Sequence, residues 1–266
     1  GNMANDGGGL ILSPIEREEL IEKEPNLSTF IRLLMGSSEF IRGNKRYCLW
    51  LKDEDLPVAS KSVEVQKIIE RTKQHRLASK DKGTNTLANR SHQFRDLNEA
   101  QNHALIIPRV SSERRKYIPI GFLDKNTIIS DSAMALYDCD FYLFTLITSE
   151  LHMVWVRAVA GRLKTDFRYS AGLCYNTFPF IKFSQEQKEK LENLAVELLT
   201  TREQFSDKSL SKLYDPDLMP EKLINAHKEI DEFVESLYQI KKGATEDEKL
   251  SVLLTKYKKM TGGQNA

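Results

Sequence analysis

The sequence predicts an α+β fold followed by a bundle of helices. Strand-like apolar segments alternate with helical patterns in the first two thirds of the chain, whereas from about residue 184 onward every segment has a helical pattern. The length of 266 residues suits two compact units of roughly 100 to 200 residues each. We therefore expect three parts: a linker with a first helix (1–24), a mixed α+β domain (25–183) and a helical domain (184–266).

The first helix is predicted over residues 14–24. Ser13 is its N-cap, Pro14 occupies the first helical position, and Glu16 completes a capping box. Pro25 then ends it. The polar, glycine-rich opening before this helix is expected to be a link, and the chain is expected to begin within a longer protein.

The next elements follow from apolar periodicity. We expect a helix over 27–35, a buried strand over 45–51 and an amphipathic helix over 60–78. Residues 79–92 show no apolar period and carry Gly, Asn, Ser and Lys, so they are predicted to be a basic loop.

Two strands, 104–110 and 117–123, are predicted to form a hairpin with the polar hexamer SSERRK at its tip. A short strand around 127–129 and a helix from about Ser149 to Gly161 come next, followed by an extended segment over 162–180. The remaining chain is predicted to contain helices over 184–205 and 221–240, and a further helix that begins at Thr245.

Composition excludes several classes of protein. Hydrophobic residues make up 40% of the chain and charged residues 29%, which is typical of a globular protein. No segment has the roughly 18 apolar residues of a membrane helix, so no membrane partner is expected. The three cysteines are odd in number and far apart, and no signal segment is visible, so we expect a reducing, cytoplasmic compartment.

Catalytic motifs are missing from the sequence. No glycine-rich loop follows a strand, and the five histidines are scattered singly. Asn176-Thr177-Phe178-Pro179 is interpreted as a turn, and so is the acidic run at 53–55. We therefore predict no catalytic residue, no metal site and no cofactor in this segment.

The hexamer SSERRK offers hydroxyls, cations and turn amides of the kind that grip phosphate oxygens. It ends a basic stretch, 71–116, with about 11 cationic residues against about 4 acidic ones. Six residues are the predicted phosphate contacts: Arg90, Ser111, Ser112, Arg114, Arg115 and Lys116. The alternative is a solvated hairpin tip in which Glu113 pairs with an arginine.

A second polar cluster lies just after Gly161. If this segment is extended, Arg162, Lys164, Asp166 and Arg168 point to one side, and Leu163, Phe167 and Tyr169 anchor the other. Lysine donates to O6 and N7 of guanine and aspartate accepts from N4 of cytosine, so Lys164 and Asp166 together are predicted to read one G·C pair. Arg168 is predicted to read a neighbouring base. A salt-bridged surface strand remains the alternative.

Several long segments resemble the C-terminal part of the MmeI-like restriction and modification enzymes. These segments are IPRVSSERRKYIPIGFL (107–123), SELHMVWVRAVAGRLKTDFRYS (149–170), YNTFPF (175–180) and SLSKLYDPDLMPEKLINAHKEID (209–231). The opening and residues 39–51 are also similar to that family, and the resemblance covers nearly the whole chain.

The resemblance implies that this chain is the target recognition domain and helical C-terminal region of a larger enzyme. Its parent would carry an adenine-N6 methyltransferase and a nuclease upstream, and would use S-adenosylmethionine and Mg²⁺. The implied partners are double-stranded DNA and the upstream methyltransferase domain of the same chain. The resemblance also implies base reading at Lys164, Asp166 and Arg168.

Two other functions remain open at this point. In the first, the helical region from residue 184 onward is a protein-interaction module that makes no contact with DNA. In the second, the chain is a free-standing methyltransferase, but that class needs a cofactor loop that the sequence lacks.

Overall fold

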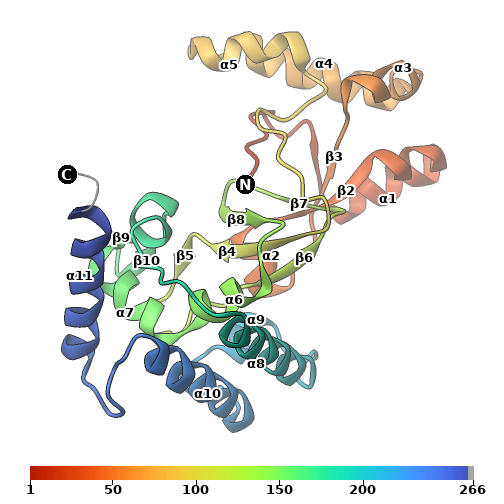
Figure 1. The fold of residues 1–266 in the computed structure, drawn as a ribbon. Helices are drawn as coiled ribbons and strands as arrows, with labels where there is room; N and C mark the ends of the chain where they lie inside the picture. The colour runs from red at the N-terminus through yellow and green to blue at the C-terminus, as the bar shows by residue number, and fades with distance from the viewer. Residues whose placement is uncertain (263–266) are drawn as a thin grey trace. The chain divides into compact units, whose positions relative to one another are not determined.

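The structure is a computed structural model, and it describes residues 1–262 (Figure 1). Contacts divide the chain into two units. Unit 1 consists of Gly1–Ile106 and Phe122–Asp138, and unit 2 consists of Ile107–Gly121 and the chain from Cys139 onward. The predicted boundary between residues 183 and 184 does not coincide with this division and stays a prediction. The mixed fold is confirmed, as is the helical character of the C-terminal region.

Unit 1 contains a four-stranded sheet with the order β1-β3-β2-β7. Its strands are β1 (Ile11–Leu12), β2 (Ile31–Met35), β3 (Tyr47–Leu49) and β7 (Thr127–Ile129). The predicted helix over 27–35 is wrong, because a 3₁₀ turn (Pro25–Phe30) leads into β2. That strand is antiparallel to β3 and parallel to β7, so pairing on both sides overrides the helical propensity of its leucines.

The helices of unit 1 are α1 (Pro14–Lys23), α2 (Ser37–Arg42), α3 (Leu56–Ala59), α4 (Val63–Leu77) and α5 (Lys82–Thr86). The predicted capping box of α1 is confirmed: the Ser13 hydroxyl accepts from the amide of Glu16, and the Glu16 carboxylate accepts from the amide of Ser13. The predicted loop over 79–92 is wrong, because α5 and a 3₁₀ turn (Leu87–Arg90) occupy most of it.

The opening of the chain is packed into unit 1 instead of forming a link. The main-chain amide of Asn2 donates to the carbonyl of Ile129 at 2.7 Å. The carboxylate of Asp6 accepts from the amides of Leu10 and Ile11 at 2.6 and 3.1 Å. Gly7 has a φ of +60°, and a Cβ there would lie 2.5 Å from the ring of His75, so this turn requires glycine.

A second sheet, most of whose residues belong to unit 1, has the order β6-β4-β8. Its strands are β4 (His103–Pro108), β6 (Gly121–Asp124) and β8 (Ala133–Tyr137). The predicted strands 104–110 and 117–123 are therefore neighbours, as expected. The segment that connects them is longer than a hairpin turn and belongs to unit 2. Strand β8 was not expected from the sequence.

Unit 2 is mainly helical (Figure 1). Its helices are α6 (Phe141–Thr148), α7 (Glu150–Val159), α8 (Gln185–Glu203), α9 (Leu210–Leu213), α10 (Glu221–Leu237) and α11 (Glu246–Gly262). Helix α8 packs against α6 and α10, and α11 packs against α7. Within residues 1–262, no helix combines the length and the apolar character needed to cross a bilayer.

Candidate nucleic-acid interface

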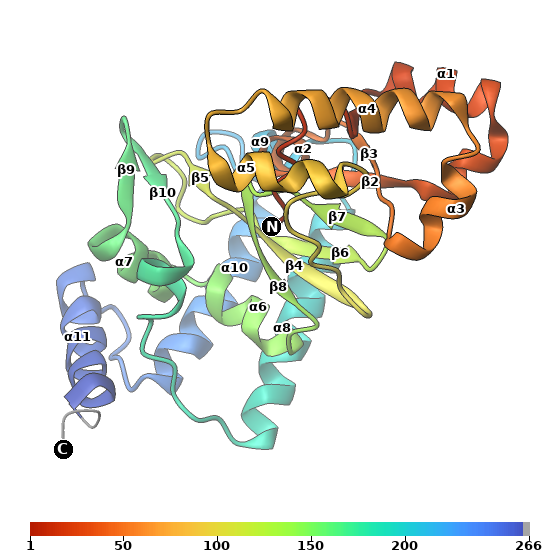
Figure 2. The same cartoon turned by 90° about the horizontal axis from the view of Figure 1, so that it is seen from above.

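One small sheet in unit 2 joins the two predicted contact regions. It consists of β5 (Val110–Ser111), β10 (Asp166–Arg168) and β9 (Gly161–Leu163), in the order β5-β10-β9. Residues 110 and 111 of β5 are opposite residues 168 and 167 of β10, in antiparallel register. Figure 2 shows β9 and β10 as a hairpin with β5 beside it. Because β5 runs directly into residues 112–116, the sheet fixes that loop next to the hairpin.

The segment after Gly161 is a β-hairpin with a two-residue turn, Lys164-Thr165, and not one extended strand. This corrects the predicted alternation of side chains. The turn places Arg162 opposite Phe167 and Leu163 opposite Asp166, and cross-strand partners point to the same face. Arg162 therefore lies on the face opposite to that of Asp166.

Phe167 anchors one face of the hairpin, and the other face is open. Phe167 is buried, and the guanidinium carbon of Arg162 lies 4.1 Å from the centre of its ring. On the other face Leu163 and Arg168 are exposed and Asp166 is half-buried. Lys164 is exposed at the turn. The three predicted base-reading side chains thus have access to a ligand.

The base of the hairpin is anchored by aromatic residues. Tyr169 is buried, and its main-chain amide donates to the carbonyl of Arg109 at 2.8 Å. Its hydroxyl lies 3.0 Å from Nε2 of His152 on α7. Burial lowers the pKa of His152 to about 3, so this imidazole is neutral and can accept from the tyrosine. A rigid base of this kind limits the positions that Asp166 and Arg168 can adopt.

Lys164 has a φ of +58°, a left-handed conformation that favours glycine. We expect Lys164→Gly to leave the free energy of unfolding unchanged or to raise it by up to about 1 kcal/mol, because the strain at this position is relieved. Chemical denaturation of the chain, wild type against variant, measures the change in the free energy of unfolding. A decrease of more than about 1 kcal/mol would show that the lysine side chain stabilises the hairpin.

Residues 112–115 form a tight turn, which we call the arginine loop. The amide of Arg114 donates to the Ser112 hydroxyl at 3.3 Å, and the amide of Arg115 donates to the Ser112 carbonyl at 3.1 Å. The guanidinium of Arg114 is exposed and pairs with Asp217 at 2.5 Å. Arg115 is half-buried, and burial lowers the pKa of its guanidinium against the attraction of Asp215.

Three of the predicted phosphate contacts are buried or already paired within the protein. The Ser111 side chain is buried, because this residue faces the same side as its partner Phe167. The amine of Lys116 pairs with Glu150 at 3.0 Å. Arg90 belongs to unit 1, where its guanidinium donates to main-chain carbonyls at positions 94 and 95.

The basic stretch 71–116 is divided between the two units, and not all of its cations are exposed. Arg76, near its start, is fully buried in unit 1, whereas Arg114 and Arg115 belong to unit 2. The local excess of charge in the sequence therefore overstates the cations available to a polyanion.

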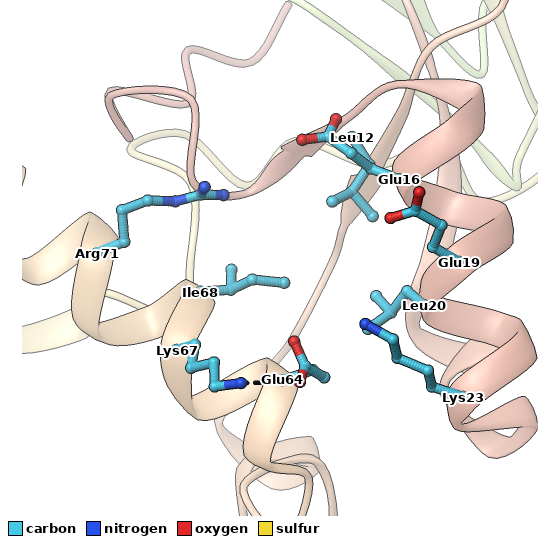
Figure 3. Close-up of a pocket in the computed structure, with 9 residues that line it drawn as sticks. All are labelled: Leu12, Glu16, Glu19, Leu20, Lys23, Glu64, Lys67, Ile68 and Arg71. Atoms are coloured by element: carbon cyan, nitrogen blue, oxygen red, sulfur yellow. Dashed lines mark hydrogen bonds and ion pairs between the residues drawn. The ribbon is translucent and has the colours of Figure 1, made fainter.

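Unit 1 has a pocket between α1 and α4, with a volume of about 280 Å³ (Figure 3). Glu16 and Glu19 line its α1 side, while Glu64 and Lys67, paired with each other at 2.9 Å, line its α4 side. Its mixed charges do not suit a phosphate backbone. In the part of the chain that the structure describes, no group of three or more His, Cys, Asp or Glu side chains could hold a metal ion.

Comparisons with known proteins assign the chain to a family. The family model described as "MmeI, target recognition domain" matches residues 1–182, and the model described as "MmeI, C-terminal domain" matches residues 183–264. This chain belongs to the MmeI family. The family's two domain descriptions together span both units.

Two relatives of this MmeI-family chain extend the comparison. DNA methyltransferase A of Bacillus subtilis (strain 168) is 44% identical over 261 residues, which cover 98% of this chain and 30% of that protein. A solved structure of the type IIL restriction-modification enzyme MmeI in complex with DNA is 35% identical, with a TM-score of 0.94 over 98% of this chain and 35% of that one. The chain thus spans about a third of the length of these relatives.

Proposed function

We propose that this chain binds double-stranded DNA and reads a short sequence on behalf of a restriction-modification enzyme. The observation that carries the proposal is the pairing of β5 with β10, because it joins the arginine loop, with its exposed Arg114, to an open hairpin face with donors and acceptors. The solved relative in complex with DNA supports the same function.

The hairpin would supply the base contacts. The amine of Lys164 would donate to O6 and N7 of guanine, and the carboxylate of Asp166 would accept from N4 of the paired cytosine. Arg168, on the same face as Asp166, would read a neighbouring base. Each good contact of this kind is worth about 1–3 kcal/mol of discrimination against the wrong base.

The arginine loop would hold the sugar-phosphate backbone and so fix the register of the hairpin. Ser112, Arg114 and Arg115 are the side chains that we assign to it. Arg114 is paired with an exposed carboxylate, Asp217, and an exposed pair of this kind is weak. A phosphate can therefore replace Asp217 at little cost.

The remaining assignments concern the parent enzyme. We propose that it is cytoplasmic, that its upstream domains provide adenine-N6 methylation and DNA cleavage, and that these domains use S-adenosylmethionine and Mg²⁺. Residues 25–183 would then be the recognition domain and residues 184–266 the helical domain. The relative named DNA methyltransferase A supports the methyltransferase assignment.

Replacing Arg114 and Arg115 by Ala tests the arginine loop. We expect weaker binding to DNA, and a slope of log affinity against log salt that is shallower by about 0.9 for each phosphate that the variant no longer neutralises. Fluorescence anisotropy with a labelled duplex of randomised sequence, from 50 to 200 mM salt, measures both. The matched control is Lys242→Ala, an exposed cation paired with Glu232. An unchanged slope would overturn the assignment, and salt-independent binding to a protein partner would favour the helical interaction module.

A further inference from the structure

Lys116 and Tyr117 directly follow the arginine loop, and the side chains of both contact one polar cluster of unit 2. The amine of Lys116 lies 3.0 Å from the carboxylate of Glu150, at the start of α7, and 3.8 Å from that of Asp231 on α10. The hydroxyl of Tyr117 donates to Oδ2 of Asp231 at 2.7 Å. The end of the arginine loop is therefore tied to two helices.

Asp231 is the centre of this cluster. Its side chain is buried, and both of its oxygens are engaged, since Oδ1 accepts from the main-chain amide of Glu150 at 2.7 Å while Oδ2 accepts from Tyr117. This carboxylate thus connects the loop with the first turn of α7. An aliphatic side chain at position 231 would leave a part-buried amide and a buried hydroxyl without acceptors, which is costly.

A second set of contacts fixes the residues that follow. The ring of Tyr117 stacks on that of His227, with centroids 3.9 Å apart and planes 15° apart. His227 lies one helical turn before Asp231, and its Nε2 is 2.9 Å from the hydroxyl of Tyr214. Arg202 of α8 donates to that same hydroxyl and to the carbonyl of Ile120, at 2.6 and 2.5 Å. The segment between the arginine loop and β6 is thus held from α8 and α10.

The charges around Asp231 come from several elements. Lys116 and Tyr117 face it from the loop, Glu150 from α7 and His227 from its own helix, and Lys249 of α11 reaches the cluster through Glu150. Burial lowers the pKa of His227 far below its ordinary value, so this ring stays neutral. Burial works to raise the pKa of Glu150, but Lys116 and Lys249 outweigh it and keep that carboxylate ionised.

We propose that Asp231 is a positioning residue for the arginine loop, so that a C-terminal helix sets the affinity for DNA without contacting it. This inference rests on the proposed function. It goes beyond that function because it makes recognition depend on α10, which belongs to the part of the chain matched by the C-terminal domain description. It also assigns Lys116 to this polar cluster instead of to the phosphate backbone.

The test is a mutant cycle in the 266-residue chain, which compares Asp231→Asn in the wild-type background and in the double arginine variant. The affinity for the labelled randomised duplex is measured for each. Asp231→Asn keeps the size of the side chain and removes its charge. We expect DNA binding about tenfold weaker at pH 7.5, within the range of effects transmitted through a packed network. In the background of Arg114→Ala with Arg115→Ala the same change should have no further effect, because the loop it positions is already disabled. The matched control is Glu232→Gln, which removes an exposed charge from the next position of α10.

The pH dependence of DNA binding gives a second measurement, which distinguishes an effect of the Asp231 charge from a purely structural effect. Burial raises the pKa of Asp231 to about 6. The wild-type carboxylate therefore becomes neutral in this range, as the asparagine already is. The tenfold difference between wild type and Asp231→Asn should shrink to less than about twofold at pH 5.

The outcomes separate the inference from the proposed function. If the double arginine variant binds DNA like wild type, the proposed function fails. If that variant weakens binding but Asp231→Asn does not, or if the two effects simply add, only the inference is overturned. Should Asp231→Asn fail to fold, Tyr117→Phe removes one hydrogen bond to Asp231 and keeps the ring stacked on His227. This variant should weaken binding by about threefold, in the range expected for removing one hydrogen bond, and unchanged binding would overturn the inference.

Discussion

Arg76→Met is expected to lower the free energy of unfolding of unit 1 by about 3–5 kcal/mol, the range seen when a buried charge network is broken. The guanidinium of Arg76 is fully buried, and all its nitrogens donate to main-chain carbonyls. The five carbonyls belong to Ala4, Asn5, Leu87, Arg90 and Gln93, at distances from 2.7 to 3.0 Å. This side chain therefore ties the opening of the chain and the turn over 87–93 to α4.

Methionine fills a similar volume but cannot donate, so the variant leaves these carbonyls without their donor. Urea unfolding measures the decrease in stability, and amide hydrogen exchange in unit 1 locates it. The matched control is Arg71→Met, on the same helix. Arg71 is exposed and donates only to the carbonyls of Gly8 and Gly9 at 3.2 Å, so a change below about 1 kcal/mol is expected. A decrease at Arg76 no larger than that at Arg71 would contradict the proposed role of the buried guanidinium.

Local signals in the sequence predicted the capped helices well. Ser13 with Glu16, and Ser184 with Gln187, form the capping boxes that their spacing indicates. Such motifs depend only on residues within one turn, and so they can be recognised without knowledge of the rest of the fold. The aromatic strand at 45–51 was also recognised, because its apolar run matches a strand buried in a sheet.

Elements that depend on distant partners were missed. The segment 31–35 forms a strand because β3 and β7 pair with it, and no property of its own five residues shows that. Helix α6 has no amphipathic period, because five of its eight residues are buried. In the candidate site, the turn at Lys164 places Arg162 on the face opposite to that of Asp166, whereas an extended strand would place both on one face. Because no glycine marks this turn, as one usually does, the sequence pattern indicated one extended strand.

The polar cluster around Asp231 could have been suspected from the sequence. His227 and Asp231 are spaced by four residues within the apolar stripe of α10, next to Leu223, Ile230 and Val234. Polar residues on a buried face are costly unless they have partners, so this pattern indicates a buried contact. The identity of the partners, Tyr117 and the start of α7, required the structure.

Exchanging the charges of the hairpin tip, with Lys164→Asp and Asp166→Lys together, is expected to reverse one base pair of the recognised sequence from G·C to C·G. A donor and an acceptor change places, while the net charge and the arginine loop stay the same. Discrimination of about 1–3 kcal/mol per contact corresponds to roughly 5- to 150-fold preference for the new pair. The backbone accepts the exchange, since aspartate tolerates the positive φ of position 164 better than most residues.

Selection from a randomised duplex library, carried out with wild type and with the exchanged variant, measures the preference at every position. Arg162→Gln is the control, because this side chain belongs to the same hairpin but lies over the ring of Phe167, on the face opposite to that of Asp166. It should leave the selected sequence unchanged. If the exchanged variant binds DNA and selects the same sequence as wild type, Lys164 and Asp166 do not read bases. Because net charge is conserved, uniformly weaker binding to all duplexes would instead indicate a distorted hairpin, and the circular dichroism of the variant would reveal it.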